Sequence, residues 1–404
     1  MHRLSILLTL LVAGFLMPSS SEERRSLSST DGNAALRYWM AFAEMDNPPA
    51  DKGLSELLEQ TAQGAAPWND ERLGPILDRN EAAIQIMQRG SRLPHCTWGL
   101  ETELGPETPI AHIARGRALA RLNLLSGLRA SSRADVEKAV EAWLSGIRFS
   151  RHLSREASLL GALVATSSLS AHLRALGNVA AEKSLAPALL SRIELELRAL
   201  PAYGFDWGQI WSAEAGSTNV LLSRLENDDG KRFIEELQKY LLEPGESGEK
   251  LAGKLGVALT DLADARKMMA LARRASADYR QILAETAAAY TLPYLQAEPR
   301  LIELERRRKA ASPLVQTLTP SLRKANAVRA EAEAQRGIIL GLLALRKAEP
   351  WLNDNGRPGL DSKVPLDPFS GKPFQLVRMP HGIEIQSRGK DAKGIPISYR
   401  LQFP

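Results

Sequence analysis

The sequence predicts a mostly α-helical protein: an antiparallel array of helical hairpins, followed by a small α+β C-terminal unit of one long helix and a three-stranded antiparallel sheet. Three observations lead to this fold class. Hydrophobic residues make up 44% of the chain and aromatic residues only 5%, and the abundant Ala, Leu, Arg and Glu lose little side-chain freedom in a helix. Apolar residues recur with the helical period from about residue 33 to residue 348. After Pro350 the period changes to two, which is typical of strands.

The overall charge is modest and evenly spread. The 404 residues include 52 basic and 47 acidic side chains, a net charge of +5. Because the two signs are interspersed along the helices, we expect no nucleic-acid partner. The single cysteine, Cys96, leaves no partner for an intramolecular disulfide. No phosphate-binding loop, nucleophile elbow, zinc-ligand pattern or pair of catalytic carboxylates is evident. The sequence therefore predicts no cofactor and no metal, and it favours a non-enzyme.

The N-terminus has the parts of a secretory signal. Arg3 precedes an uncharged run at 4–17, and small residues follow at 19–21. The run is shorter than the roughly 20 residues of a membrane span. We therefore expect residues 1–21 to be a signal peptide and residues 22–31 a flexible, Ser-rich leader. The protein is then exported to the periplasm or cell envelope. The alternative is that the segment is retained as an N-terminal anchor, and a membrane is expected as a partner only in that case.

Residues 32–200 form the expected helical-hairpin domain. In its first helix, 33–46, the apolar residues Leu36, Trp39, Met40 and Ala43 follow the i, i+3, i+4, i+7 pattern, so we expect them to face the core. Short turns between the later helices force neighbours to lie antiparallel. Further helices are expected at 51–63, 70–89, 110–129, 134–153, 155–177 (capped by Ser154) and 187–199, with a Pro- and Gly-rich loop at 91–109.

The helix at 134–153 has the clearest apolar stripe, which predicts a buried face. The stripe consists of Val136, Val140, Trp143 and Ile147. The segment ADVEKAVEAWLSGIRFSRHL, with small residues at Ala139 and Ala142, resembles the second helix of a tetratricopeptide unit. This resemblance covers about 110–178 and implies stacked helical hairpins. The 34-residue signature is not repeated, so no binding residues are carried across.

A second helical region is expected at 201–318, with helices at 206–226, 229–242 and 294–311. Its main feature is a long helix, 259–290, whose apolar stripe resembles a coiled-coil seam. We expect the partner of this seam to be the 294–311 helix or the next one, which Thr319 and Pro320 begin. The seam residues are Leu262, Met269, Ala272, Ser276, Tyr279, Leu283, Thr286 and Tyr290.

The tail, 319–404, combines a helix at 320–348 with three short strands. Turns are expected at 380–382 and 389–394. A one-residue shift of register would turn every side chain to the other face, so the alternation specifies which residues pack on the apolar stripe of the helix. These residues are Phe374, Leu376, Ile383, Ile385 and Tyr399.

Two short motifs in the tail resemble the C-terminal region of type II secretion pseudopilins, over about 325–394. One is Asp-Pro-aromatic-x-Gly-x-Pro-aromatic at 367–374, and the other is Gly-hydrophobic-x-hydrophobic-x-Ser-x-Gly-x-Asp at 382–391. The resemblance implies the helix-plus-sheet fold, and such tails are similar to those of large exported bacterial proteins of unknown function. It does not imply filament assembly, because Gly14-Phe15 is not followed closely by Glu. Some members bind calcium with several acidic residues, whereas Asp391 stands here between lysines.

One loop and the helix after it gather four aromatic side chains. Tyr and Trp suit partly hydrated interfaces, so this segment is the candidate ligand or partner groove. The alternative is a hydrophobic plug at the start of a helix that Asp206 caps. The candidate groove residues are Tyr203, Phe205, Asp206, Trp207 and Trp211.

Three other groups have both a functional and a structural interpretation. His95-Cys96 is the one adjacent pairing of histidine and cysteine. The basic run at 306–309 could contact an anionic lipid or nucleic acid. Histidines on three successive helices could share a metal; they are His112, His152 and His172. In each case we expect the structural role: a packed cysteine, a solvated helix face and histidines that need no ligand.

The sequence thus predicts an exported helical scaffold or binding protein of the cell envelope, with a protein or envelope partner. The alternative is an envelope hydrolase whose catalytic residues lie in the loops at 91–109 or 201–212. A pocket shared by several of His95, Glu101, His112 and Asp206 would favour the hydrolase.

Overall fold

The computed structural model describes residues 32–46, 51–156, 158–182, 185–227, 246–348, 365–391 and 394–402, with four further positions between 234 and 242. The expected signal segment, the leader and most of the expected helix at 229–242 lie outside the described residues. The described chain is mostly α-helical with one small antiparallel sheet near the C-terminus, which confirms the predicted fold class.

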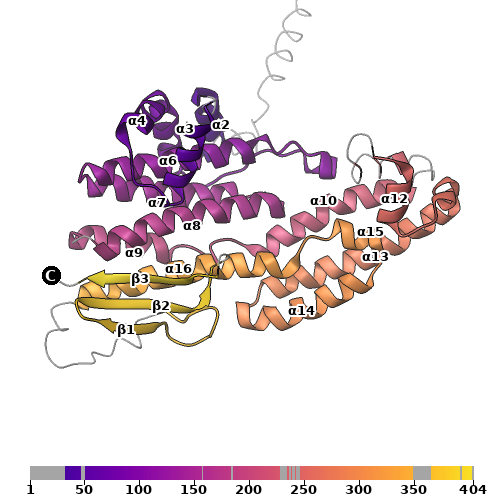
Figure 1. Ribbon diagram of the computed structural model, residues 1–404. Coiled ribbons are helices and arrows are strands. Elements are labelled where there is room, and N and C mark those ends of the chain that lie inside the picture. Colours follow the sequence, from indigo (N-terminus) through magenta and orange to yellow (C-terminus); the bar gives the residue numbers. More distant parts are fainter. Residues whose placement is uncertain are drawn as a thin grey trace, which may run out of the picture.

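The elements follow the predicted order (Figure 1). The hairpin region contains α2 (Ala34–Glu44), α3 (Lys52–Ala62), α4 (Asp70–Arg79), α5 (Glu81–Gly90), η1 (Thr102–Glu107), α6 (Ala111–Ser132), α7 (Val136–Leu153), α8 (Leu159–Glu182) and α9 (Pro187–Arg198). The second region contains α10 (Trp207–Asn227), α12 (Gly248–Leu255), η2 (Leu259–Ala263), α13 (Ala265–Tyr290), α14 (Tyr294–Ala310) and α15 (Pro313–Leu318). The last part contains α16 (Leu322–Ala348), β1 (Gln375–Met379), β2 (Gly382–Lys390) and β3 (Pro396–Gln402).

Helices α6, α7 and α8 pack one on the next, as the short connections predicted. Trp143 at the centre of α7 is 1% exposed, and its indole Nε1 donates to the carbonyl of Leu124 at 3.3 Å. The two helices approach closely because Gly127 lies beneath the indole, where a Cβ would stand 2.3 Å from Nε1. Val140 and Ile147 are also buried and Val136 is partly buried against the core, so the predicted stripe on α7 faces inward.

The predicted core face of α2 is wrong. Leu36, Trp39 and Met40 are 46%, 40% and 51% exposed. The face that packs inward is centred on Tyr38, whose hydroxyl forms a 2.6 Å hydrogen bond with His152 Nδ1 of α7. Small residues let this face come close to α5, because Gly90 lies against the Tyr38 ring. The buried residues of α2 are Ala34, Ala35, Tyr38, Ala41 and Phe42.

Three expected helix boundaries in the hairpin region are also wrong. The 70–89 segment is two helices, because the Asn80 side chain donates to Ile76 O (2.8 Å) and accepts from Asp46 N (3.0 Å) between them. The helix expected to end at residue 129 continues to Ser132, and the chain reverses at Ala134, which has a positive φ of 62°. Ser154 ends α7 instead of capping α8.

The long helix of the second region is shorter than expected at its start. Residues 259–263 form the separate turn η2, and Asp264 then caps α13 by accepting from Arg266 N at 3.0 Å. Met268 is buried where Met269 was expected, and the seam from Ala272 onward is buried as predicted. The expected partner α14 packs on α13, but α10 makes the more extensive contact, and the sequence did not predict it.

Helix α16 connects the two helical regions (Figure 1). It begins at Leu322, and not at Thr319-Pro320 as expected, since Thr319 ends α15. The helix packs on α14, and also on α8, α9, β2 and β3. Arg346 near its end donates to the carbonyls of Ala180 and Ala181 on α8, at 2.8 and 2.9 Å. Residues on both sides of the domain borders expected at 200 and 318 therefore pack against each other.

The three strands form an antiparallel meander with the order β1-β2-β3. Leu376 lies opposite Ile385, which in turn lies opposite Tyr399, so all three share a face, as the alternation predicted. This face packs on α16, where the Phe374 ring fills the space above Gly337. It also packs on α8, where the Tyr399 ring occupies the space above Gly177. The sheet therefore covers two helices, and the sequence predicted only one.

The two tail motifs meet at one buried carboxylate. Asp367 is 0% exposed and stands in the loop before β1. Its oxygens accept from the hydroxyls of Ser370 (2.9 Å) and Ser387 (2.8 Å), and from the backbone N–H groups of Phe369 (3.2 Å) and Arg388 (2.9 Å). Since Ser387 and Arg388 belong to β2, this carboxylate fastens the loop to the sheet.

Among the described residues, one segment is long and apolar enough to cross a membrane: Leu159–Ala181 of α8. It is the helix on which α7, α16 and β3 pack. More than half of it is buried. Its apolar character is therefore accounted for by its place in the core.

Candidate functional site

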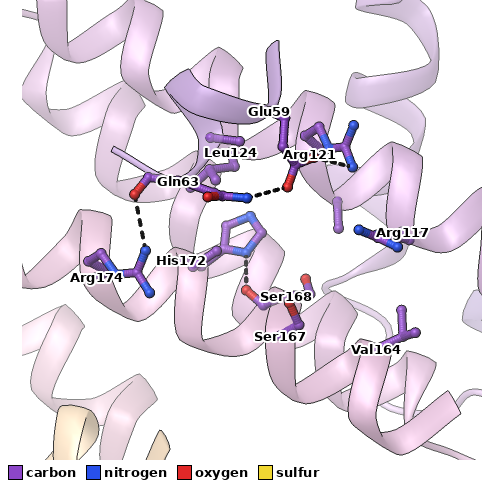
Figure 2. Close-up of a pocket in the computed structure, with 13 residues that line it drawn as sticks. Glu59, Gln63, Arg117, Arg121, Leu124, Val164, Ser167, Ser168, His172 and Arg174 are labelled. Carbon is purple, nitrogen blue, oxygen red and sulfur yellow. Dashed lines mark hydrogen bonds and ion pairs between the residues drawn. The ribbon is translucent and has the colours of Figure 1, made fainter. Parts of the chain in front are cut away.

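A groove between α3, α6 and α8 is the candidate site (Figure 2). Its volume is about 290 Å³, close to the lower end of the range for small-molecule sites. Its walls carry charged and polar side chains, and its floor is built partly from small and apolar residues. The lining residues are Glu59, Ala62, Gln63, Arg117, Ala120, Arg121, Leu124, Val164, Ser167, Ser168, Ala171, His172 and Arg174.

Three guanidinium groups border the groove. Arg117 and Arg121 are four residues apart on α6, so they project from the same face of the helix, and Arg174 comes from α8. Arg121 pairs with Glu59 of α3, with 2.7 Å between Nη2 and Oε2. Arg174 Nη1 donates to the carbonyl of Gln63 at 3.2 Å. Within the part of the chain that the structure describes, Arg117 has no ion-pair partner.

The charges of the groove do not balance. Its lining contains three arginines and one glutamate, and therefore has a net charge of +2. Arginine presents several N–H donors in a planar fork that matches carboxylate and phosphate oxygens. The groove is therefore suited to an anion.

His172 lines the groove but adds no charge. Burial lowers the pKa of its imidazole to about 4, so the ring is neutral at neutral pH. Nδ1 lies 2.8 Å from the carbonyl of Ser168, which only an N–H can satisfy. Nε2 must then be the acceptor, and it lies 3.2 Å from Asn123 Nδ2. With both nitrogens engaged, this imidazole cannot activate Ser167 or Ser168 as a nucleophile.

The hydrogen bonds around His172 and Asn123, called the His172 network below, extend to α5 and α7. Asn123 Nδ2 also donates to Ala142 O at 2.7 Å, and Asn123 Oδ1 accepts from Gln88 at 3.0 Å. The ring fits between α7 and α8 because Gly146 has no side chain; a Cβ there would lie 2.0 Å from Nε2. These contacts hold α6 and α8 in fixed positions, so they also fix the spacing between the arginines of the two helices.

The candidate groove residues near the start of α10 are divided between two environments. Trp207 and Trp211 are 2% and 0% exposed and pack on Tyr290, with ring centroids 5.7 and 5.0 Å apart. Tyr203 is half-buried beside Arg329, and its hydroxyl accepts from Tyr294 N at 2.7 Å. These three side chains belong to the core or its edge and form no groove.

Phe205 and Asp206 line a separate cavity of about 260 Å³, together with Arg151, Arg155 and Glu156. Asp206 also caps α10, since its Oδ1 accepts from Gln209 N at 2.9 Å. The cap is the role expected under the plug interpretation. Two arginines face two carboxylates across this cavity, so it has no excess of either charge.

The histidines and the cysteine do not form a common site. His112 packs on Trp98, with ring centroids 4.7 Å apart, whereas His152 is bonded to Tyr38 and His172 belongs to the Asn123 network. Burial raises the pKa of the Cys96 thiol to about 12, which keeps it protonated and unreactive. Among the described residues, no group of three or more His, Cys, Asp or Glu side chains could hold a metal ion.

The residues of the hydrolase alternative lie in different places. His95 is exposed, and its carbonyl accepts from Ala34 N at 2.8 Å. Glu101 is an exposed residue whose carbonyl accepts from the Thr108 hydroxyl. Neither the groove between α3, α6 and α8 nor the cavity beside Asp206, both built from described residues, is lined by two of the four residues His95, Glu101, His112 and Asp206.

The basic run on α14 is largely neutralised. Arg306 pairs with Glu303 (2.7 Å), Arg307 with Glu285 (2.7 Å) and Arg308 with Glu305 (2.8 Å). The Arg306–Glu303 pair lies on a solvated helix face, as expected, whereas the side chains of Arg308 and Glu305 are only 19% and 13% exposed.

The groove between α3, α6 and α8 was not predicted from the sequence. One signal was present, since Arg117 and Arg121 stand four apart on a helix that was expected at 110–129. The other two contributors, Glu59 and Arg174, come from distant helices, and nothing local relates them to α6.

Comparisons with protein-family models, with curated proteins and with solved structures find no match to this chain.

Proposed function

We propose that this protein is an exported helical binding protein of the cell envelope whose groove between α3, α6 and α8 holds an anionic ligand. The observation that carries the proposal is the approach of Arg117, Arg121 and Arg174 to one groove that contains a single carboxylate, Glu59. A charge-assisted hydrogen bond from arginine is stronger than one between neutral groups. The rigid hairpins supply the framework, and the ligand supplies the missing negative charge.

The same groove favours binding over catalysis. A hydrolytic site needs a nucleophile beside a base that can accept its proton. Here the imidazole of His172 has both nitrogens engaged, and the two serines of the groove have no other histidine among its lining residues. The proposal is therefore a binding protein and not an enzyme.

Titration calorimetry of the purified protein with inorganic phosphate and with acetate tests the binding site. We expect Arg117→Gln and Arg174→Gln each to weaken binding about tenfold, since each removes a charged hydrogen-bond donor. Arg115→Gln is the matched control, because this exposed arginine stands on α6 two residues from Arg117 and does not line the groove. No detectable binding of either anion, or equal loss in the control, would contradict the proposal.

Export is tested by the intact mass of the protein recovered from the cells that make it. The signal segment predicts a mature N-terminus near Glu22. A mass that still includes residues 1–21 in an envelope fraction would indicate an anchored protein. A full-length protein in the cytosolic fraction would refute export.

A further inference from the structure

We propose that Glu59 is an internal substitute for the ligand, and that the ligand is a phosphomonoester whose phosphate displaces Glu59 from Arg121. This inference rests on the proposed function, since it concerns the occupant of the same groove. It adds the chemical class of the ligand and a mechanism by which binding is coupled to the position of α3.

Glu59 already occupies Arg121 as an anionic ligand would. Its Oε2 lies 2.7 Å from Arg121 Nη2, and its Oε1 accepts from Gln63 Nε2 at 2.7 Å. The carbonyl of Gln63 in turn accepts from Arg174 at 3.2 Å. Figure 2 shows this chain of polar contacts from Arg121 through Glu59 and Gln63 toward Arg174. The end of α3 is thus held by two of the three arginines that border the groove.

The Glu59–Arg121 pair is weak enough to exchange. The two side chains are 38% and 30% exposed, and partly hydrated ion pairs of this kind contribute little because water and salt screen them. A ligand with more negative charge and more acceptor oxygens competes favourably for the same guanidinium.

Helix α3 is attached to the core by few side chains. Of its eleven residues, only Leu58 and Thr61 are buried, and Leu54, Leu57 and Ala62 pack against the core while partly buried. Segments that bury few apolar side chains open locally at low cost compared with global unfolding. Release of Glu59 and of the Gln63 carbonyl would therefore loosen α3 while α6 and α8 stay fixed by the His172 network.

The charge of the groove favours a phosphomonoester over a carboxylate. Once Glu59 leaves, three guanidinium groups border the groove and none of them has a carboxylate partner there. A phosphomonoester carries close to two negative charges at neutral pH and has three acceptor oxygens, so it can bridge donors from both α6 and α8. The apolar part of the floor, which includes Leu124 and Val164, can take the organic group.

The test compares two probes with the same ring: phenyl phosphate, which is a dianion, and benzoate, which is a monoanion. Calorimetry of the purified protein should show phenyl phosphate binding at least tenfold more tightly. Glu59→Gln should tighten phenyl phosphate binding about fivefold, because it removes the competing carboxylate and its repulsion. Glu56→Gln is the matched control: it lies one turn earlier on α3, is exposed and does not line the groove.

Hydrogen exchange on the unmodified protein provides a second readout. Saturation with phenyl phosphate should speed exchange at the amides of 52–62 and leave those of α6 and α8 unchanged or slower. Binding to vesicles that contain phosphatidic acid is compared with binding of free phenyl phosphate. The comparison shows whether the phosphomonoester is carried by a lipid or by a soluble molecule. Tight binding of either one supports the proposal if the Arg117→Gln substitution abolishes it.

Two results would overturn the inference while the proposed function stands. If Glu59→Gln weakens phenyl phosphate binding or leaves it unchanged, Glu59 is not displaced by the ligand. If benzoate binds as tightly as phenyl phosphate, the ligand is not selected as a dianion. Failure of every anion to bind would instead refute the proposed function itself.

Discussion

Lowering the pH from 7.5 to 5 should reduce the free energy of unfolding by about 6 kcal/mol, or about 2 kcal/mol for each of three buried histidines. Burial lowers the pKa of His112, His152 and His172 to about 4. The folded protein keeps these rings neutral down to that pH, whereas the unfolded chain protonates them below about 6.5. Their stabilising contribution is therefore complete above pH 6.5, declines as the pH falls toward 4, and is lost below that.

The environments of the three rings explain the shift. His172 and His112 are 1% and 0% exposed, so their charged forms would lose most of their hydration. His152 is buried beside Tyr38, and the nearby positive charges of Arg151 and Arg155 lower its pKa further. No carboxylate offsets the lowered pKa of any of the three rings by stabilising its protonated form.

Urea denaturation at a series of pH values measures this effect. Replacing one buried ring, as in His172→Gln, should remove about a third of the pH dependence between 7.5 and 5. His381→Gln is the control, because this histidine is exposed in the β1–β2 turn and should leave the pH dependence unchanged. Equal stability at pH 5 and pH 7.5 would show that the rings are accessible to protons in the folded state.

Asp367→Ala should destabilise the tail by about 3–5 kcal/mol, because it leaves four donors without their shared acceptor. Two of these donors, the Ser387 hydroxyl and the Arg388 N–H, lie on β2. Hydrogen exchange should therefore speed up in β2 and in the loop before β1. Asp367→Asn keeps the shape and loses the charge, and we expect an intermediate cost.

A second aspartate in the same tail serves as the control. Asp391 also accepts a backbone hydrogen bond, from Ile395 N at 2.8 Å, but it is not fully buried. Asp391→Ala should cost about 1 kcal/mol, in line with an ordinary hydrogen bond. If both substitutions cost the same, the Asp367 network does not hold the loop to the sheet.

The helices were predictable in position, but the buried face was predictable only where neighbours cover most of a helix. On α7 the stripe that contains Trp143 is buried, and so are Leu144 and Phe149 outside it. On α2 two overlapping stripes fit the helical period, one with Leu36, Trp39 and Met40 and one with Tyr38. The choice depends on the small residues of α5 and on the hydrogen bond to His152, and neither can be read from α2 alone.

The candidate site was not predictable for a related reason. Glu59 and Arg174 are far apart in the sequence and reach the same groove only through the packing of α3 and α8 on α6. An aromatic cluster such as that around Trp207 attracts attention in a sequence, but aromatic side chains fill cores as readily as they line grooves. Arginines are frequent throughout this chain, so their convergence has no local signature.

The two tail motifs, at 367–374 and 382–391, contact each other in the structure. Asp367 belongs to the first and Ser387 to the second, and the structure joins them by a 2.8 Å hydrogen bond. Gly389 of the second motif accommodates the ring of Phe369 from the first, since a Cβ there would lie 2.2 Å from the ring. In this chain both motifs therefore act together to shape the loop on the sheet.

The position of α8 has a consequence for the order in which the chain can fold. One side of α8 is covered by α7, which directly precedes it, but another side is covered by α16 and β3, which are synthesised much later than α8. The bond from Arg346 to the carbonyl of Ala180 spans 166 residues. Contacts of such sequence separation form late and slow folding. While a ribosome is still making the chain, α8 must remain partly uncovered, and the native core can close only after residue 402 is available.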